Sequence, residues 1–133
     1  MIADQLLDWH EDAHLSKLDT HAAFKLVPVK PTLVRFQGFT FLGKYFVETQ
    51  LVFGGCSSPA LYDQLHKVFT IVVMLRSGAD SDQIHWTLNN FVCASPDRST
   101  DERIVLTYLH LAAEIDLPLA ALDDGDKAFI LKQ

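Results

Sequence analysis

The sequence predicts an α+β domain in which an antiparallel sheet carries two main helices on one face. Two long segments place apolar residues at helical spacing, and shorter segments of strand-forming residues stand before, between and after them. With 133 residues, 49% of them hydrophobic, the chain can bury a core without disulfide staples. No Pro-, Gly- or Ser-rich linker and no internal repeat divides it, so residues 1–133 are expected to form one domain.

The first third of the chain is expected to form a short helix, a strand and a hairpin. The helix lies around Ala3 to Trp9, and the strand runs from His14 to Leu18. Two further strands, Val34 to Phe41 and Tyr45 to Val52, are predicted to pair through a turn at Leu42-Gly43-Lys44.

The first long helix is expected to begin at Ser58 and to end near Gly78. Ser58 suits the N-cap, and Pro59 suits the first helical position, where its missing N–H costs nothing. Apolar residues then recur at steps of four and three, which predicts one buried helical face made of Leu61, Leu65, Val68, Val72 and Leu75.

A tight hairpin and a second long helix follow. Trp86 to Cys93 consists of an apolar strand, the polar pair Asn89-Asn90 and a second apolar strand, the pattern of a hairpin with an exposed tip. Ser99 and Glu102 form a capping-box pattern ahead of the helix. The buried stripe predicted for this helix is Ile104, Tyr108, Leu111 and Ile115.

Two apolar segments joined by a turn are expected after the second helix. Leu117 to Leu122, a turn at Asp124-Gly125 and Ala128 to Leu131 close the chain. Three aspartates around Gly125 suggest a calcium loop, but the glycine is misplaced for an EF-hand and no closing glutamate follows. A solvated turn is favoured for these aspartates, which are Asp123, Asp124 and Asp126.

The charge distribution is uneven. A net charge of −6 argues against a general nucleic-acid coat protein, which would be basic. Residues 16–44 nevertheless hold five basic residues against one acidic residue, with phenylalanines interleaved, and such a segment can grip a phosphate backbone and stack on bases. The alternative is that strand alternation turns the aromatic rings into the core and the basic groups into solvent. The residues concerned are Lys17, Lys25, Lys30, Arg35, Lys44, Phe24, Phe36, Phe39 and Phe41.

The sequence also predicts the compartment. Cys56 and Cys93 are too few for a disulfide framework and lack metal-site spacing, so both are expected to be reduced, packed thiols. Asp4 and Asp8 interrupt the apolar residues at the amino terminus, which argues against a signal peptide. The apolar run from Val68 to Leu75 is too short to span a bilayer. An intracellular protein of the cytoplasm or nucleus, without membrane contact, is therefore expected.

Four motifs follow one another along nearly the whole chain. The first, Lys17 to Val29, contains Asp19 with Phe24 five positions later. The second, Gly38 to Val47, is a Gly-rich aromatic hairpin, and the third, Leu51 to Pro59, reads LVFGGCSSP. The fourth is the asparagine hairpin that follows the long helix. In this order they resemble the palm of reverse transcriptases, especially those of tyrosine-recombinase (DIRS-type) retrotransposons. Val52 departs from the proline usual in the third motif. The resemblance implies a ferredoxin-like palm with one finger hairpin, lacking the thumb, the connection region and much of the fingers.

The resemblance also implies roles for particular residues. Asp19 would bind metal at a strand end, and Phe24 would screen the sugar 2′ position. The asparagine pair occupies the place of the family's LDD catalytic box, and Lys127 lies near a lysine that assists the leaving pyrophosphate. Contacts with nucleotide or template are implied for Phe24, Lys25, Phe53, Gly54, Gly55, Ser58 and Pro59.

Asparagines at both box positions would weaken metal binding. A carboxylate offers a divalent ion a charge as well as an oxygen, whereas an amide offers only a carbonyl dipole. Since unit charges a few ångströms apart near a surface interact by roughly 1 to 4 kcal/mol, losing two should cost several kcal/mol. Asp19 would be left as a weak ligand for Mg²⁺ or Mn²⁺, with no cofactor bound tightly and no useful phosphoryl transfer. The alternative is that Asn89-Asn90 is simply a turn that tolerates left-handed backbone.

A competing motif lies near the amino terminus. His10-Glu11-Asp12-Ala13-His14 satisfies H-E-x-x-H, which on a helix sets two imidazoles on one face to bind zinc. The segment is mostly polar and runs directly into the Asp19 strand. Solvated histidines are therefore favoured over a catalytic zinc site.

Three functional hypotheses remain open. The first is a degenerate palm, inactive as a polymerase, that acts through homo-oligomerisation or a protein partner, with Tyr45 to Val52 as one candidate surface. The second is weak binding of RNA or an RNA–DNA hybrid through the basic segment and the Phe24 side of the site. The third is an inactivated fragment of an RNA-directed DNA polymerase, which restoring Asn89→Asp and Asn90→Asp would distinguish.

Overall fold

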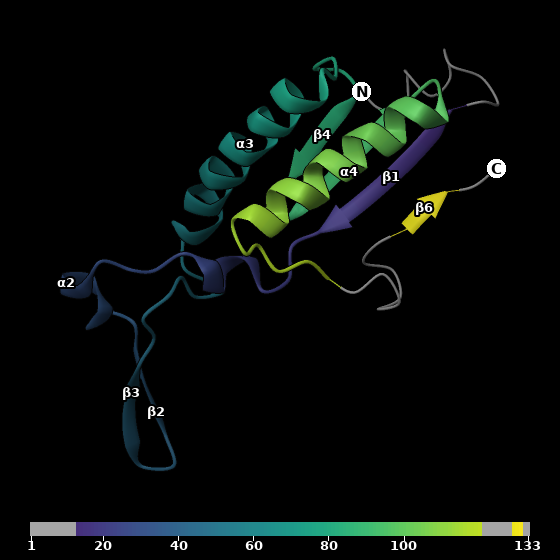
Figure 1. The fold of residues 1–133 in the computed structure, drawn as a ribbon. Helices are drawn as coiled ribbons and strands as arrows, with labels where there is room; N and C mark the ends of the chain where they lie inside the picture. The colour runs from purple at the N-terminus through teal and green to yellow at the C-terminus, as the bar shows by residue number, and fades with distance from the viewer. Residues whose placement is uncertain (1–12, 121–128, 132–133) are drawn as a thin grey trace.

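A four-stranded antiparallel sheet covered by two helices forms the main body of the protein. The computed structural model describes residues 13–120 and 129–131. The strands β1 (His14–Asp19), β4 (Ile84–Thr87), β5 (Asn90–Ser95) and β6 (Phe129–Leu131) lie in the order β4-β5-β1-β6. Helices α3 (Ser58–Ser77) and α4 (Arg98–Glu114) run side by side over this sheet (Figure 1). The chain order of these elements is βαββαβ with β1 between β5 and β6, so the predicted α+β, ferredoxin-like arrangement is confirmed.

A second, smaller sheet projects from this body. It is the hairpin of β2 (Gly38–Phe41) and β3 (Lys44–Val47), which follows the short helices η2 (Ala23–Leu26) and α2 (Pro31–Val34) (Figure 1). The hairpin was predicted, but its strands are shorter than expected.

Two local features shorten these strands. Pro31 stands in the first turn of α2, where its fixed backbone angle favours a helix, so Val34 is helical and the predicted strand start there is wrong. On the far side of the hairpin Gln50 forms an isolated bridge with Pro28 and β3 ends at Val47. The turn at Leu42 and Gly43 uses φ angles of 50° and 72°.

The core lies between the sheet and the two helices. Phe91 of β5 and Tyr108 of α4 have fully buried rings whose centroids are 4.4 Å apart. The carboxylate of the buried Asp101 accepts hydrogen bonds from the Ser16 hydroxyl at 2.6 Å and from the Cys93 thiol at 3.2 Å, which ties α4 to β1 and β5. Cys93 therefore packs as predicted.

Helix α3 has the predicted length but presents a different face to the core. It ends at Gly78, whose φ of 69° is the left-handed conformation typical of a C-cap. Ser57 rather than Ser58 is the N-cap, and no side chain caps this end. The predicted buried stripe is wrong, because four of its residues, Leu61, Leu65, Val68 and Leu75, are exposed and Val72 is half-buried. The buried face consists instead of Tyr62, His66, Phe69, Thr70, Val73 and Ser77.

The physical reason is that α3 carries two adjacent stripes at helical spacing. The residues at the core stand one position after predicted ones, as Tyr62 follows Leu61 and Phe69 follows Val68. One position corresponds to about 100° of rotation on a helix. Periodicity therefore finds the helix without choosing between the two stripes, and packing of Phe69 and Val73 with Ile84 and Phe91 decides the orientation.

Helix α4 begins differently from the prediction. The side chain of Asp97 caps it by accepting a hydrogen bond from the Thr100 N–H at 2.8 Å, whereas Glu102 pairs with Arg98 rather than completing a capping box with Ser99. The predicted stripe is confirmed at three positions and wrong at Ile115, which is exposed because the helix ends at Glu114. The three confirmed residues are Ile104, Tyr108 and Leu111.

The closing segment at Ala128 to Leu131 supplies β6, which pairs antiparallel with β1. Before it, Leu119 forms an isolated bridge with Thr20. The predicted helix at Ala3 to Trp9, the Asp124-Gly125 turn and Lys127 lie outside the described residues. Within residues 13–120 and 129–131, no helix combines the length and apolar character needed to cross a membrane.

Candidate functional site

The end of β1 and the β4–β5 hairpin bring three predicted site residues together. Asp19 is the last residue of β1 and lies opposite Asn90, the first residue of β5. The tip is shifted by one position from the prediction, since Leu88 and Asn89 form the turn and Leu88 takes a left-handed φ of 51°. The backbone N–H of Thr20 donates to the Asn89 carbonyl at 3.0 Å, which fixes the tip against β1.

Side-chain amides link this cluster. The Asn89 Nδ2 donates to Asp19 Oδ1, and the Asn90 Nδ2 lies 3.5 Å from Asn89 Oδ1. All three side chains are half-buried. An amide donor thus occupies one oxygen of the Asp19 carboxylate. An aspartate at position 89 would instead face Asp19 as a like charge and would need a proton or a metal ion between the two.

The predicted nucleotide-contacting residues form a second group beside this cluster. The Phe24 ring lies 5.1 Å from the exposed ring of Phe53 and 5.9 Å from the buried ring of Tyr62. Tyr62 is related to both groups. Its ring contacts Phe24, and burial together with the negative charge of Asp19 raises the pKa of its phenol. Lys25 forms an ion pair with Glu48 at 2.5 Å, so the Lys25 charge is partly neutralised at the base of the β2–β3 hairpin, called the finger hairpin below.

The glycine loop packs against the start of α3. Gly54 has a φ of 83°, a conformation that other residues rarely adopt. A Cβ on Gly55 would lie 2.7 Å from the hydroxyl oxygen of the buried Ser58, so this position is held close to the helix. Pro59 follows exposed in the first turn. Cys56 in the same loop is exposed, which corrects the expectation that both cysteines pack.

Sequence reasoning missed a group of polar side chains buried beneath the site. Thr20, His66, Thr70 and Tyr108 each bury a side-chain polar atom there. The Thr20 hydroxyl interacts with the phenols of Tyr62 and Tyr108, and His66 interacts with the Leu88 backbone. Burial raises the pKa of the Tyr108 phenol to about 12 and lowers the pKa of His66. The steps of four from Tyr62 to His66 and Thr70 were the available signal, since they place three polar groups on one face of an apolar helix.

The competing zinc motif ends in a strand. His14 is the first residue of β1, whereas H-E-x-x-H requires both histidines on one helical face. His10, Glu11 and Asp12 lie outside the described residues. In the part of the chain that the structure describes, no three His, Cys, Asp or Glu side chains group as metal ligands.

The βαββαβ body with a finger hairpin ahead of its first helix is a reverse-transcriptase-like fold. Solved structures of foamy virus protease-reverse transcriptase share it. The form named dRH, in complex with double-stranded DNA, is 18% identical with a TM-score of 0.67 over 90% of this chain and 19% of that one.

Two further foamy virus structures agree with this assignment. The native prototype foamy virus enzyme is 18% identical, with a TM-score of 0.60 over 80% of this chain and 13% of that one. The complex with an RNA/DNA hybrid is 20% identical, with a TM-score of 0.58 over 76% of this chain and 13% of that one. The chain therefore spans less than a quarter of these proteins. No family model and no curated protein matches the sequence.

Proposed function

We propose that this protein is a reverse-transcriptase-like palm module that does not transfer phosphoryl groups and that binds RNA or an RNA–DNA hybrid through its finger hairpin. The observation that supports the first part is the hydrogen bond from the Asn89 amide to the Asp19 carboxylate. A catalytic metal needs charged oxygen ligands that face it together. Here one carboxylate is already occupied by an amide donor.

The test of this part restores the charges. The variant Asn89→Asp/Asn90→Asp should bind Mn²⁺ saturably in isothermal titration calorimetry, whereas the wild type should show no saturation at the same millimolar concentrations. Adding Asp19→Asn to the double variant should remove the gained binding. If the double variant binds Mn²⁺ no better than the wild type, the three residues do not correspond to a catalytic box. A primer-extension assay on the double variant then tests whether the chain is an inactivated polymerase fragment.

The exposed aromatic residues of the finger hairpin support the second part. Phe39 and Phe46 stack across the hairpin with centroids 5.5 Å apart and are 51% and 42% exposed. The Arg35 guanidinium lies over the exposed Phe36 ring at 4.9 Å. These rings and that of Phe41 are exposed rather than turned into the core, whereas Phe24 is half-buried against Tyr62, so the alternative explanation fits only Phe24. Exposed rings beside cations are the usual platform for unpaired bases.

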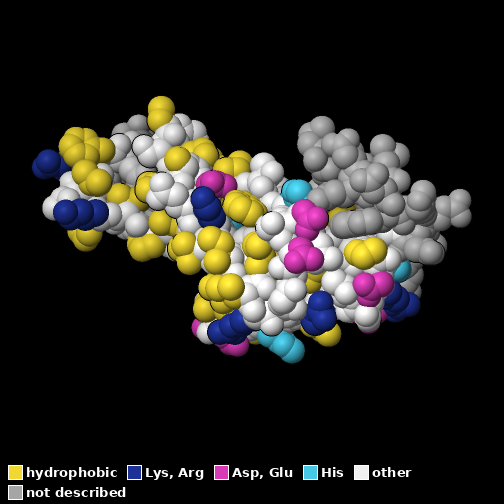
Figure 2. Space-filling view, turned by 90° about the horizontal axis from the view of Figure 1, so that it is seen from above, with side chains coloured by type: hydrophobic (Ala, Val, Ile, Leu, Met, Phe, Trp, Pro, Cys, Tyr) yellow, Lys and Arg dark blue, Asp and Glu magenta, His cyan; other side chains and the backbone are white. Residues whose placement is uncertain are grey.

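Charge separates the finger hairpin from the rest of the molecule. Residues 20–60 contain four basic residues and one acidic residue, while the whole chain is acidic. Figure 2 shows dark blue basic side chains at the end of the molecule where α2 and the hairpin lie. A nucleic acid would therefore be attracted to this end and repelled elsewhere.

The test measures fluorescence anisotropy of labelled single-stranded RNA and of an RNA–DNA hybrid across a salt series. Saturable binding that weakens as salt rises is expected. The variant Phe39→Ala/Phe46→Ala should weaken binding by about tenfold or more, because stacking contributes roughly 1 to 3 kcal/mol per base. Leu61→Ala, an exposed apolar residue on α3, is the matched control and should leave binding unchanged. No binding at low salt contradicts this part of the proposal.

Protein association is the second candidate. It is favoured by the outer face of α3, defined as Leu61, Leu65, Val68 and Leu75, which forms an exposed apolar stripe. Hydrophobic side chains extend from the hairpin end toward the middle of the face seen in Figure 2. Sedimentation velocity should then show a concentration-dependent oligomer that Val68→Glu disrupts. A monomer at all concentrations would argue against self-association.

A further inference from the structure

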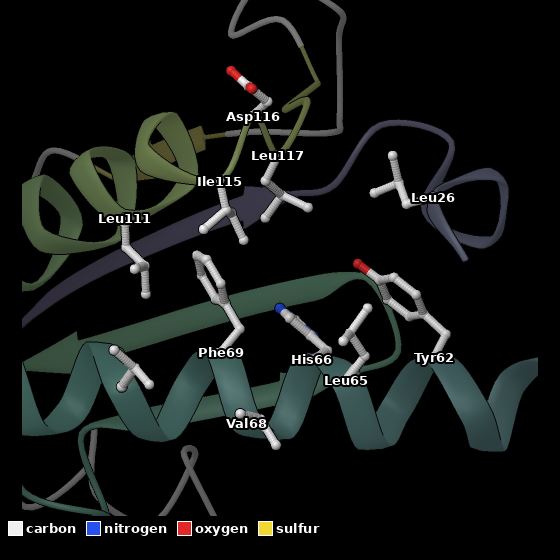
Figure 3. Close-up of a pocket in the computed structure, with 11 residues that line it drawn as sticks. Leu26, Tyr62, Leu65, His66, Val68, Phe69, Leu111, Ile115, Asp116 and Leu117 are labelled. Carbon is white, nitrogen blue, oxygen red and sulfur yellow. The ribbon is translucent and has the colours of Figure 1, made fainter. Parts of the chain in front are cut away.

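An apolar cavity lies between α3 and the segment that follows α4. Its volume is about 500 Å³. Leu65 and Val68 form its α3 side, and Ile115 and Leu117 form the opposite side (Figure 3). Leu117 is half-buried and the other three side chains are exposed, so the cavity presents apolar surface to solvent along both sides. Apolar surface of this kind is typical of interaction sites.

The C-terminal turn of α4 builds the side of the cavity that faces α3. The Leu117 N–H donates to the Ala112 carbonyl at 2.8 Å and the Asp116 N–H donates to the Ala113 carbonyl at 3.3 Å, the hydrogen-bond pattern of a Schellman motif. This turn folds the chain back, so that Leu117 points toward α3 across the cavity (Figure 3). The left-handed position of such a motif is usually a glycine. Here it is Asp116, which has a φ of 53°.

Asp116 is unfavourable for the fold in two respects. Its left-handed backbone is more strained than that of a glycine, and its negative charge lies at the helix end where the macrodipole is already negative. The exposed carboxylate points away from the apolar walls of the cavity and has no partner among the described residues (Figure 3). Glu114 differs, because both of its carboxylate oxygens accept from Arg76 at 2.8 Å. A strained residue with no role inside the fold is a candidate for contact with a partner.

The α3 side of the cavity has the spacing of a helix-pairing seam. From Leu61 to Leu75 the outer face of α3, together with Val72, follows steps of four, three, four and three residues. This is the spacing of the a and d positions of a coiled coil, which pack against another helix. No helix in the described part of the chain covers these residues, since Val72 is half-buried and the rest are exposed. Leu65, Val68 and Val72 belong to both the seam and the cavity, so a single helix lying along α3 would contact both.

The charge around the cavity favours a basic partner. Residues 61–120 contain eight acidic and four basic residues, and no lysine or arginine of the described residues lines the cavity. A second copy of this chain would bring the same excess of negative charge toward Asp116. A helix with a lysine or arginine beside its apolar stripe would instead complement the Asp116 carboxylate.

We propose that this cavity and the outer face of α3 bind an amphipathic helix of a partner protein, with apolar side chains in the cavity and a basic side chain at Asp116. The proposal rests on protein association, the second candidate function, and specifies the chemistry of the partner. It does not depend on RNA binding by the finger hairpin. Helix binding by a monomeric protein would therefore support it even where self-association and RNA binding both fail.

The probe is a synthetic amphipathic helix of leucine and lysine, as long as the outer face of α3, titrated into the full chain by isothermal titration calorimetry. Saturable binding is expected, and a counterpart peptide with glutamate at every lysine position should not bind. Asp116→Asn should weaken binding of the lysine peptide by about twofold to fivefold, the value of an exposed ion pair. Glu102→Gln removes the same charge near the start of α4 and should leave the affinity unchanged.

Two exposed leucines test the apolar contact. Leu65 lines the cavity and Leu106 of α4 does not, yet both are 53% exposed, so replacing either by glutamine should leave the fold intact. Leu65→Gln should weaken peptide binding by about tenfold or more, whereas Leu106→Gln should not change it. Equal losses within either pair of variants, or no saturation, would overturn the proposal. A dimer that Leu65→Gln disrupts and that excludes the peptide would overturn it in favour of a second copy as the occupant.

Discussion

The two β-hairpins of this protein have similar turns and opposite surroundings. Each is closed by a two-residue turn that begins with a left-handed leucine, Leu42 between β2 and β3 and Leu88 between β4 and β5. In the β4–β5 hairpin one face is buried by the two long helices, and Phe91 and Cys93 are inaccessible to solvent. Every residue of β2 and β3 is exposed.

Different contacts therefore hold the two hairpins. The exposed one relies on the Phe39–Phe46 stack and on the Gln37 side-chain amide, which donates to the carbonyls of Glu48 and Gln50 at 3.0 and 3.1 Å. The buried one is held by the core itself. The contrast teaches that an aromatic residue in a strand of this chain stabilises the core only where a helix covers it; elsewhere it stabilises its own hairpin and stays accessible to a ligand.

The largest effect expected from this contrast is on stability. Phe91→Ala should lower the free energy of unfolding by about 3 to 5 kcal/mol, because it leaves a cavity beside Tyr108. Phe39→Ala, the same change in the exposed hairpin, should cost less than about 1 kcal/mol. Urea denaturation monitored by circular dichroism measures both. Similar costs would mean that the finger hairpin is part of the cooperative core.

The loss of stability in acid should depend more on Asp97, which follows the buried hairpin, than on Glu48, which follows the exposed one. Hydrogen bonds from Ser99 and Thr100 lower the pKa of Asp97, after β5, from 3.8 to about 2, while Lys25 lowers the pKa of Glu48, after β3. A depressed carboxyl pKa gives stability above the unfolded pKa that is lost as pH falls through the folded value. Asp97→Asn should therefore flatten the loss of stability between about pH 4 and pH 2.

The matched change after the exposed hairpin is Glu48→Gln. Its effect on the same pH titration should be smaller, because the Glu48 side chain caps no helix and its ion pair joins the exposed hairpin only to Lys25 of η2. Thermal unfolding midpoints recorded across this pH range compare the two variants. Equal flattening would contradict the separation of finger hairpin and core.

The smallest effect is expected at the turns. Glycine relieves left-handed strain but loses more backbone entropy on folding, so Leu42→Gly should change stability by less than about 1 kcal/mol, in the stabilising direction. Leu88→Gly gains the same relief but also loses the packing of a half-buried side chain, so it should be destabilising. Chemical denaturation of the two variants in parallel gives the sign of each change.

Local signals in the sequence predicted the elements more reliably than their environment. Pro59 and Gly78 predicted the ends of α3, and the polar step at Asn89-Asn90 predicted a hairpin at that point. The side of α3 that meets the sheet could not be predicted, because both stripes are apolar and only tertiary packing chooses between them.

The candidate site was predictable in outline. Sequence motifs placed Asp19, Asn89 and Asn90 at one site, and strand register brings them together. Their role, and those of Phe24 and Lys25, remain predictions. The cavity lined by His66 and Leu117 was not foreseen, because it depends on where the chain runs after α4, and no local pattern encodes that path.

The different surroundings of the two cysteines should make them react with thiol reagents at different rates. Cys56 is exposed in the glycine loop, whereas burial and the neighbouring Asp101 carboxylate raise the pKa of the Cys93 thiol and disfavour the reactive thiolate. A maleimide dye should therefore attach at one position without engineering, beside the aromatic Phe24–Phe53 pair. The rate at which a second dye attaches to Cys93 would then measure how often β5 separates from α4 in the native protein.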